Sequence, residues 1–141
     1  MARPQATPIG LQLARTARTV SQEFERAMAA AGGSAAAWQV LLLVRSGQWG
    51  TQSGLAKAMG VTGPTMTHHL GSLEAQGFVR RWRDESNRRV QQVELTDAGI
   101  ELFDRLRDVA VRHDQRLRSL LTEREVDQLS KLLHKLEQAP D

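Results

Sequence analysis

Cysteine and tyrosine are absent from the 141-residue chain, and aromatic residues make up only 4% of it. Without cysteine the protein can form no disulfide bond, no thiolate metal site and no thiol-based redox switch. Histidines do not replace the missing thiols: His68 and His69 are adjacent and diverge by about 100° on a helix, and neither His113 nor His134 has a histidine four residues away. We therefore expect no bound metal.

A long hydrophobic run is also missing. The longest aliphatic stretch runs from Val40 to Val44, whereas a helix needs about 20 apolar residues to cross a bilayer. The first eight residues contain no apolar core of the kind that a signal peptide needs. We therefore expect no membrane partner and a cytoplasmic location.

The common signatures of enzyme active sites do not occur either. The sequence has no glycine-rich phosphate loop, no Gly-x-Ser-x-Gly nucleophile motif and no paired carboxylates on an evident cleft. We therefore expect a protein that is not an enzyme and that binds no cofactor.

The charge of the chain is small but unevenly distributed. The net charge is +3, and the ten residues 80–89 contain five arginines and two acidic residues, while the other 131 residues hold fourteen charges of each sign. We expect no acidic side chains to match these five guanidinium groups. A basic patch on an otherwise neutral chain indicates one focused anionic partner, and nucleic acid is the first candidate.

The apolar residues follow a helical period at both ends of the chain. Stripes with steps of three and four residues are formed by Leu13, Ala17, Val20, Phe24, Ala27 and Ala31, by Phe103, Leu106, Ala110, His113, Leu117 and Leu120, and by Val126, Leu129, Leu133 and Leu136. A chain this short buries about 40 terminal residues of this kind fully only against a second copy. The sequence therefore predicts a homodimer whose interface includes Leu13, Val20, Leu117, Leu120, Leu129 and Leu133.

Hydroxyl residues mark the expected helix starts. Ser34, Thr51, Thr62, Thr96 and Thr122 each precede a segment with apolar residues at helical spacing, as N-cap residues do. The first helix is expected over residues 13–31, before Gly32 and Gly33. The helix after Thr62 is expected to point Met66, Leu70, Leu73 and Gly77 inward and Pro64, Thr67, His68 and Gly71 outward.

Two short runs, residues 78–83 and 90–95, carry the β-branched, aromatic and alternating pattern of strands. The six polar residues between them predict a hairpin with a charged tip. We therefore expect a mainly α fold with a small β wing: a winged helix-turn-helix over residues 34–99, dimerisation helices over 10–33 and 100–141, and a flexible N-terminus over 1–9.

The helix after Thr62 and the adjacent hairpin together suit DNA. An uncharged polar helix can enter the major groove, and an arginine-rich hairpin beside it can reach phosphates or the minor groove. The predicted DNA-binding residues are Thr62, Pro64, Thr65, Thr67, His68, Arg81, Arg83, Arg88 and Arg89. Two alternatives stay open: the hairpin is a solvated edge protected by its charge, or Arg81 and Arg83 pair with Asp84 or Glu85.

Residues 55–81 resemble the helix-turn-helix of the multiple-antibiotic-resistance regulator (MarR) family. Residues 84–89 and the following Val-Glu-Leu-Thr-Asp-Ala-Gly resemble that family's wing and the start of its long dimerisation helix. Two positions depart from the family pattern: His68 stands where arginine is usual, and Asn87 where a second aspartate is common.

The resemblance implies a homodimeric regulator of transcription that binds a palindromic operator in double-stranded DNA. It also implies repression that is relieved when a small aromatic or phenolic effector enters a cleft between the DNA-reading and dimerising parts. Trp38, Met66 and His113 are the candidate residues of this cleft, although residues such as the first two are more often part of the core, and a histidine such as the third more often part of an interface. The competing interpretation is a sequence-independent architectural DNA binder or a winged helix that binds proteins.

Overall fold

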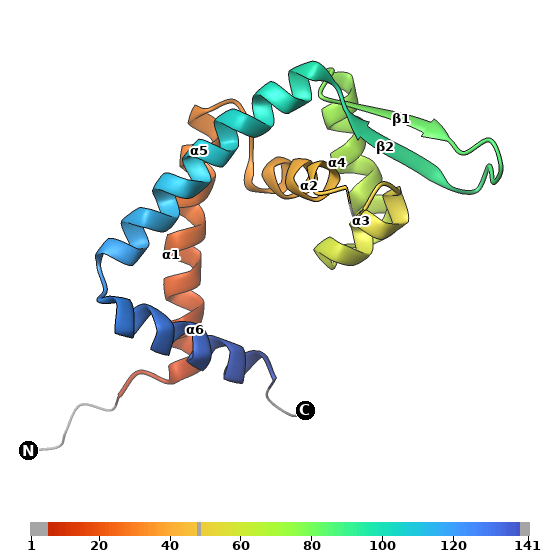
Figure 1. The fold of residues 1–141 in the computed structure, drawn as a ribbon. Helices are drawn as coiled ribbons and strands as arrows, with labels where there is room; N and C mark the ends of the chain where they lie inside the picture. Colours follow the sequence, from red (N-terminus) through yellow and green to blue (C-terminus); the bar gives the residue numbers. More distant parts are fainter. Residues whose placement is uncertain (1–5, 48, 139–141) are drawn as a thin grey trace, which may run out of the picture.

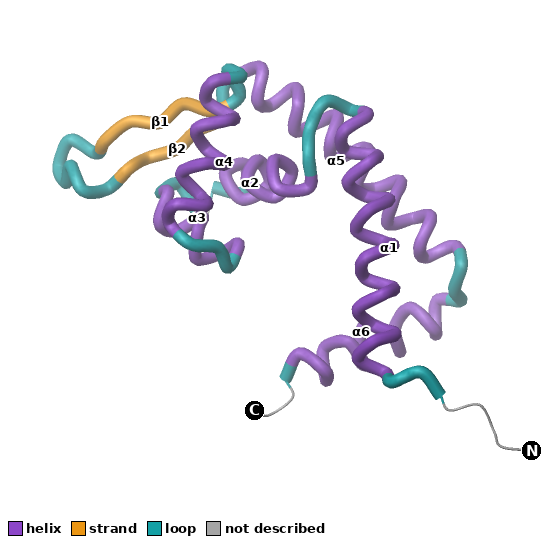
Figure 2. Tube along the Cα trace, turned by 180° about the vertical axis from the view of Figure 1, so that it is seen from behind, coloured by secondary structure: helices purple, strands orange, loops and turns teal. Residues whose placement is uncertain are grey.

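The computed structural model describes residues 6–47 and 49–138 of the chain. Residues 35–95 form a head of three helices and one antiparallel hairpin, and the other three helices form a long stem, whose far end holds the start of the first helix and the last helix (Figure 1, and Figure 2 from behind). In chain order the elements are α1 (Ile9–Ala30), α2 (Ala35–Arg45), α3 (Gln52–Met59), α4 (Gly63–Ala75), β1 (Val79–Arg83), β2 (Gln91–Leu95), α5 (Asp97–Ser119) and α6 (Glu123–Glu137). The predicted class, a mainly α winged helix-turn-helix with a small β wing, is confirmed.

All five predicted N-caps are confirmed. The side chains of Ser34, Thr51, Thr62, Thr96 and Thr122 each accept a hydrogen bond from the backbone N–H three residues on. Thr122 belongs to a complete capping box, because Glu125 also accepts from the Thr122 N–H. Local sequence therefore sets the start of every helix except α1.

The prediction for the start of the first helix was four residues late. Helix α1 begins at Ile9, directly after Pro8 at its N-cap position. Ile9 is 70% exposed, so the first turn is not buried and does not extend the apolar stripe from which the helix was predicted. Residues 1–5 of the predicted flexible N-terminus lie outside the described residues.

The hydrophobic core lies in the head and in the first half of α5. Its buried side chains come from α2, α3, α4, both strands and α5, with Met28 as the one contribution of α1. Among the described residues α6 buries none. The stem therefore lacks a core of its own within one chain.

Helix α4 packs as predicted along one face, with two differences. Met66, Leu70 and Leu73 are buried. Gly77, expected to face inward, is exposed because it lies beyond the helix at φ +81° and turns the chain into β1. Gly71, expected to face outward, is half-buried, because the Arg81 side chain covers its side of the helix.

The hairpin pairs Val79 with Leu95, Arg81 with Val93 and Arg83 with Gln91. Each strand begins one residue later than predicted, because the N–H of Phe78 still bonds to the end of α4 and that of Val90 bonds within the tip turn. A bridge between Thr51 and Gln92 ties the tip half of β2 to the N-cap of α3.

The described segments contain no single helix that is long and apolar enough to cross a membrane. Only the pair α1 and α2 passes by length and composition when taken together, and that pair is bent by 76°.

Candidate nucleic-acid interface

The first two turns of α4 present an exposed face without charge. The Thr62 hydroxyl donates to the Thr65 hydroxyl at 2.9 Å and accepts from the Thr65 N–H at 3.3 Å. Thr67 Oγ1 donates to the Gly63 carbonyl at 3.1 Å and accepts from Gln52 Nε2 at 2.7 Å. Because these bonds fix the threonine rotamers, the methyl groups and free lone pairs have defined directions on the surface.

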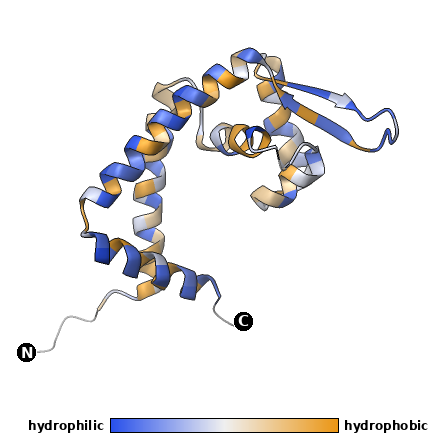
Figure 3. Cartoon of the chain, in the orientation of Figure 1, coloured by the Kyte–Doolittle hydropathy of each residue, from blue (hydrophilic) through white to orange (hydrophobic). Residues whose placement is uncertain are grey.

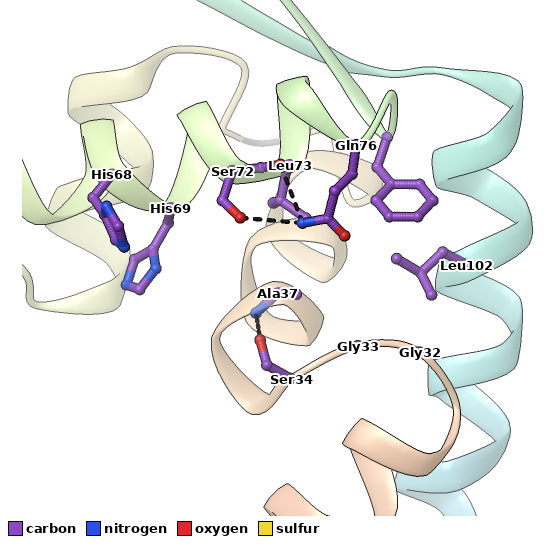
Figure 4. A pocket seen from close by; sticks show the side chains of 11 residues that line it. Gly32, Gly33, Ser34, Ala37, His68, His69, Ser72, Leu73, Gln76 and Leu102 are labelled. Carbon is purple, nitrogen blue, oxygen red and sulfur yellow. Dashed lines mark hydrogen bonds between the residues drawn. The ribbon is translucent and has the colours of Figure 1, made fainter.

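His68 and His69 continue this surface toward the middle of α4. Their ring centroids are 6.1 Å apart, and neither imidazole has a hydrogen-bond or ion-pair partner in the described part of the chain. Figure 4 shows both rings projecting from the same side of the helix as Ser72 and Gln76. The described residues contain no group of three or more side chains that could hold a metal ion.

These side chains line a cavity of about 290 Å³ between α4, the turn that joins α1 to α2, and α5. Its apolar wall includes Leu73, Phe78 and Leu102, and Gln76 is fixed by bonds of 3.1 Å from its Nε2 to the carbonyl and the hydroxyl of Ser72. The sequence reasoning missed this cavity. The sequence feature that could have indicated it is the spacing of His68, Ser72 and Gln76, which lie four residues apart and so share one face of the helix.

The wing tip is a tightly bonded turn that carries exposed cations. Asp84 Oδ1 accepts from the Ser86 hydroxyl at 2.5 Å and the Ser86 N–H at 2.8 Å, and Oδ2 accepts from Gln92 at 3.0 Å. Hydrogen bonds from the Ser86 side chain, then from Gln92 and from the Ser86 backbone, lower the pKa of Asp84 to about 2. The turn is thus held by an aspartate that stays ionised.

Arg83, Arg88 and Arg89 are exposed cations of the wing for which the described residues offer no acidic partner. The Arg83 guanidinium donates to the Arg88 carbonyl at 2.9 Å, and the Arg89 N–H donates to the Asn87 side chain at 3.2 Å. Both bonds stiffen the backbone beneath the two arginines of the tip, whose guanidinium groups remain exposed. Figure 3 shows the whole tip as hydrophilic, projecting beyond α3 and α4.

The other two arginines of the cluster have acidic partners, contrary to the prediction. Arg80 pairs with Glu94 across the hairpin at 3.2 Å, and Arg81 pairs with Glu74 of α4 at 3.1 Å. The alternative that Arg81 and Arg83 pair with Asp84 or Glu85 was also wrong, because the Asp84 carboxylate is occupied by Ser86 and Gln92. A side-chain hydrogen bond from Arg81 lowers the pKa of Glu74.

The exposed residues of α4 and of the wing are taken together as one candidate surface, called the reading surface below. Strand β1 packs against α4, where Arg81 pairs with Glu74 in the last turn, and the hairpin projects from that end of the helix (Figure 1). The reading surface comprises Thr62, Pro64, Thr65, Thr67, His68, Arg83, Arg88 and Arg89, all of them exposed. It combines uncharged groups that suit base edges with cations that suit phosphates.

The predicted interface residues lie along the stem. Leu13, Leu129 and Leu133 line an apolar hollow between α1 and α6, together with Ile9, Leu132 and Leu136. Leu120 is 75% exposed, whereas Val20 and Leu117 are half-buried within the chain itself. Figure 3 shows hydrophobic and hydrophilic residues alternating along α1 and α6.

The three candidate effector residues are not brought together. Trp38 stacks on Phe103 with the ring centroids 5.4 Å apart, and the Met66 side chain is fully buried in the core. His113 lies 5.0 Å from the Phe24 ring and borders a different hollow between α1 and α5. The cavity beneath α4 therefore has a lining different from the one predicted.

Comparison with known proteins agrees with this arrangement. The sequence profile of the MarR family matches residues 34–90. The transcriptional regulator PecS of Dickeya dadantii (strain 3937) is 32% identical over 85 residues, which is 60% of this chain and 51% of that protein, so the match spans about half of its length.

Among solved structures, the transcriptional repressor CouR bound to a 23-mer DNA duplex is 30% identical, with a TM-score of 0.85 over 93% of both chains. A mutant MarR from E. coli complexed with operator DNA is 27% identical, with a TM-score of 0.77 over 89% of this chain and 93% of that one. The S. aureus MepR–DNA complex, at 23% identity and a TM-score of 0.85, covers 93% and 97% of the two chains and shares the fold.

Proposed function

Since the chain belongs to the MarR family, we propose that it is a sequence-specific DNA-binding transcriptional regulator, a repressor that binds a palindromic operator as a homodimer. The main observation behind this proposal is the reading surface, which combines an exposed, uncharged face of α4 with a wing that carries three exposed arginines without an acidic partner among the described residues. The family's relatives CouR and MarR are solved with a DNA duplex and with operator DNA, respectively.

The two halves of the reading surface suit two parts of the duplex. Helix α4 fits a major groove about 12 Å wide, where Thr65, Thr67 and His68 meet base edges. The wing then lies over the neighbouring backbone, where Arg88 and Arg89 meet phosphates or the minor groove. Because its partner is the operator, we also propose that the protein acts in the cytoplasm.

The homodimer is proposed from the stem. Leucines of α1 and α6 are 36–49% exposed at Leu13, Leu129, Leu133 and Leu136, on elements that contribute almost nothing to the core of one chain. Large exposed apolar surface of this kind marks an interface. A two-fold dimer would then place two copies of α4 about 34 Å apart, one turn of DNA.

An effector belongs to the same proposal, because the cavity beneath α4 adjoins the reading surface. His68 and His69 offer imidazole groups to an acidic or phenolic ligand, and Leu73, Phe78 and Leu102 offer an apolar wall to its ring. A ligand there that changes the position of α4 should weaken operator binding by about 5–150-fold, the usual range of coupling.

Calorimetry of the purified protein against a panel of benzoic acids and phenols tests the effector. Binding should be abolished in His69→Ala and retained in His134→Ala, whose histidine lies on α6 outside the cavity. No heat from any compound at millimolar concentration would count against an effector of this class.

Selection of bound fragments from the source genome tests the main proposal. A regulator should enrich one palindromic sequence and prefer it over bulk genomic DNA by about a thousandfold or more. An architectural DNA binder would show no such preference, and a winged helix that binds proteins would retain no fragment at all.

A further inference from the structure

Arg81 lies at the meeting point of β1, α3 and α4. Its backbone N–H donates to Glu74 Oε2 at 3.2 Å, and its Nη2 donates to Glu74 Oε1 at 3.1 Å, so one residue holds both oxygens of one carboxylate. Its Nη1 donates to Gln52 Oε1 at 3.3 Å. The wing strand is thereby joined to the last turn of α4 and to the first turn of α3.

Gln52 extends this network to the reading surface. Its side-chain oxygen accepts from Arg81, and its side-chain nitrogen donates to Thr67 Oγ1 at 2.7 Å. Thr67 lies in the N-terminal half of α4 and Glu74 in its last turn. The network therefore holds α4 at two points along its length and fixes the rotamer of a proposed DNA contact.

Arg81 itself is enclosed. Its side chain is 15% exposed, compared with 64% for Arg80 on the same strand. The guanidinium lies beside Gly71, where an added Cβ would be 3.9 Å from Nη2, and Nε is buried without a hydrogen-bond partner among the described residues. A guanidinium that is 15% exposed, with both Nη groups bonded to protein acceptors and a buried Nε, cannot also reach a phosphate.

We infer that Arg81 contacts no DNA and is a positioning residue, which sets the angle between α4 and the wing through Glu74 and orients Thr67 through Gln52. This inference rests on the proposed function, because it concerns how specific DNA is distinguished from random DNA. It replaces the prediction, made from the sequence, that Arg81 binds DNA. We therefore expect Arg81 to affect the preference for operator over random DNA, but not the electrostatic attraction to phosphates.

The test compares affinities for the selected operator and for random duplex in a set of variants, each over a range of salt concentrations. Arg81→Lys keeps the charge but cannot hold both acceptors, and Glu74→Gln keeps the shape but removes the ion pair. Arg80→Lys and Glu94→Gln are the matched controls, since they alter an exposed ion pair on the same hairpin.

Arg81→Lys and Glu74→Gln should each weaken operator binding by about tenfold, the size of one well-placed base contact. Affinity for random duplex and the slope of log K against log salt should stay as in the parent protein, because every phosphate keeps its cation. The control variants should leave the ratio of operator to random affinity unchanged. The combined Arg81→Lys, Glu74→Gln variant should be little worse than either single variant, since both break one link.

Two outcomes would overturn the inference. If Arg81 contacts a phosphate, Arg81→Gln lowers the salt slope by about one unit and weakens operator and random duplex alike. In that case Glu74→Gln, which removes a competing acid, strengthens binding rather than weakening it.

Melting curves exclude unfolding as the cause of a reduced preference. Gln52→Ala is a milder variant, because it leaves the ion pair with Glu74 intact and removes only the link to Thr67. It should reduce the operator preference with an unchanged melting temperature, and an unchanged preference in Gln52→Ala would contradict the role assigned to Thr67. If the operator selection fails altogether, the proposed function fails and not the positioning role alone.

Discussion

At the junction of wing and stem, the space beside Gly99 admits only a hydrogen atom. A Cβ on Gly99 would lie 2.0 Å from the Phe78 carbonyl oxygen, which accepts from the Thr96 N–H, and the Thr96 hydroxyl donates to the Gly77 carbonyl. Gly99→Ala should therefore destabilise the fold by about 3 kcal/mol, as backbone must move to relieve the overlap. Thermal denaturation measures this destabilisation. Gly63→Ala is the control, because nothing lies within 4 Å of its added Cβ.

Asp84 gives the wing tip a defined dependence on pH. Its pKa is lowered from 3.8 to about 2, so the turn is fully stabilised above pH 3.8 and loses this stabilisation as the pH falls through about 2. The NMR shifts of the Ser86 and Asn87 amides should therefore titrate with a midpoint near pH 2. Ser86→Ala removes the largest cause of the shift and should move the midpoint up toward 3.8; an unmoved midpoint would show that Ser86 does not lower this pKa.

Single residues were predictable where their partners are close in sequence. The five capping side chains bond three residues away, so sequence spacing alone identified them. Arg81 was assigned to DNA because its true partners, Glu74 and Gln52, lie 7 and 29 residues away on other elements. Sequence spacing carries no information on which of five arginines the fold will enclose.

At the scale of the element, the wing should attract DNA through the arginines of its tip. Arg88→Ala and Arg89→Ala should weaken operator and random duplex alike and lower the salt slope by about one unit for each phosphate that is no longer neutralised. Filter binding or fluorescence anisotropy across a salt series measures both quantities. Arg105→Ala, an exposed arginine on α5, is the control for a general change of charge. An unchanged affinity and salt slope in the double variant would show that the two arginines do not contact DNA and are only solvated residues at the edge of the hairpin.

The helical elements were largely predictable and the cavity was not. The spacing of apolar residues and the N-cap residues predicted the bounds of α2 to α6 to within a few residues, because each of these helices buries an apolar stripe or has a capping side chain. The cavity beneath α4 depends on how three elements meet, and Gly33 illustrates the point: a Cβ there would lie 2.7 Å from Leu106, so the loop passes against α5. Contacts of this kind are set by tertiary packing and leave no periodic signal.

For the whole molecule, association should depend on the leucines of α1 and α6. Leu129→Asp with Leu133→Asp places two charges in the proposed interface, where each unpaired buried charge costs several kcal/mol. The unmodified protein should sediment as a dimer at micromolar concentration and the double variant as a monomer. Lys131→Asp, on an exposed part of the same helix, is the control for added charge. A monomeric unmodified protein would contradict the proposed dimer.

Helix α5 is one unbroken helix that runs from the wing junction along the stem to the turn before α6. Its 23 residues make a rod about 34 Å long. In a dimer, two such rigid helices would fix the orientation of one head relative to the other. One base pair inserted between the half-sites turns one of them by about 34° relative to the other. Operator recognition should then depend on the number of base pairs between the half-sites. A one-pair insertion should reduce the affinity more than most single base changes do. A half-turn insertion should reduce the affinity to that for a single half-site.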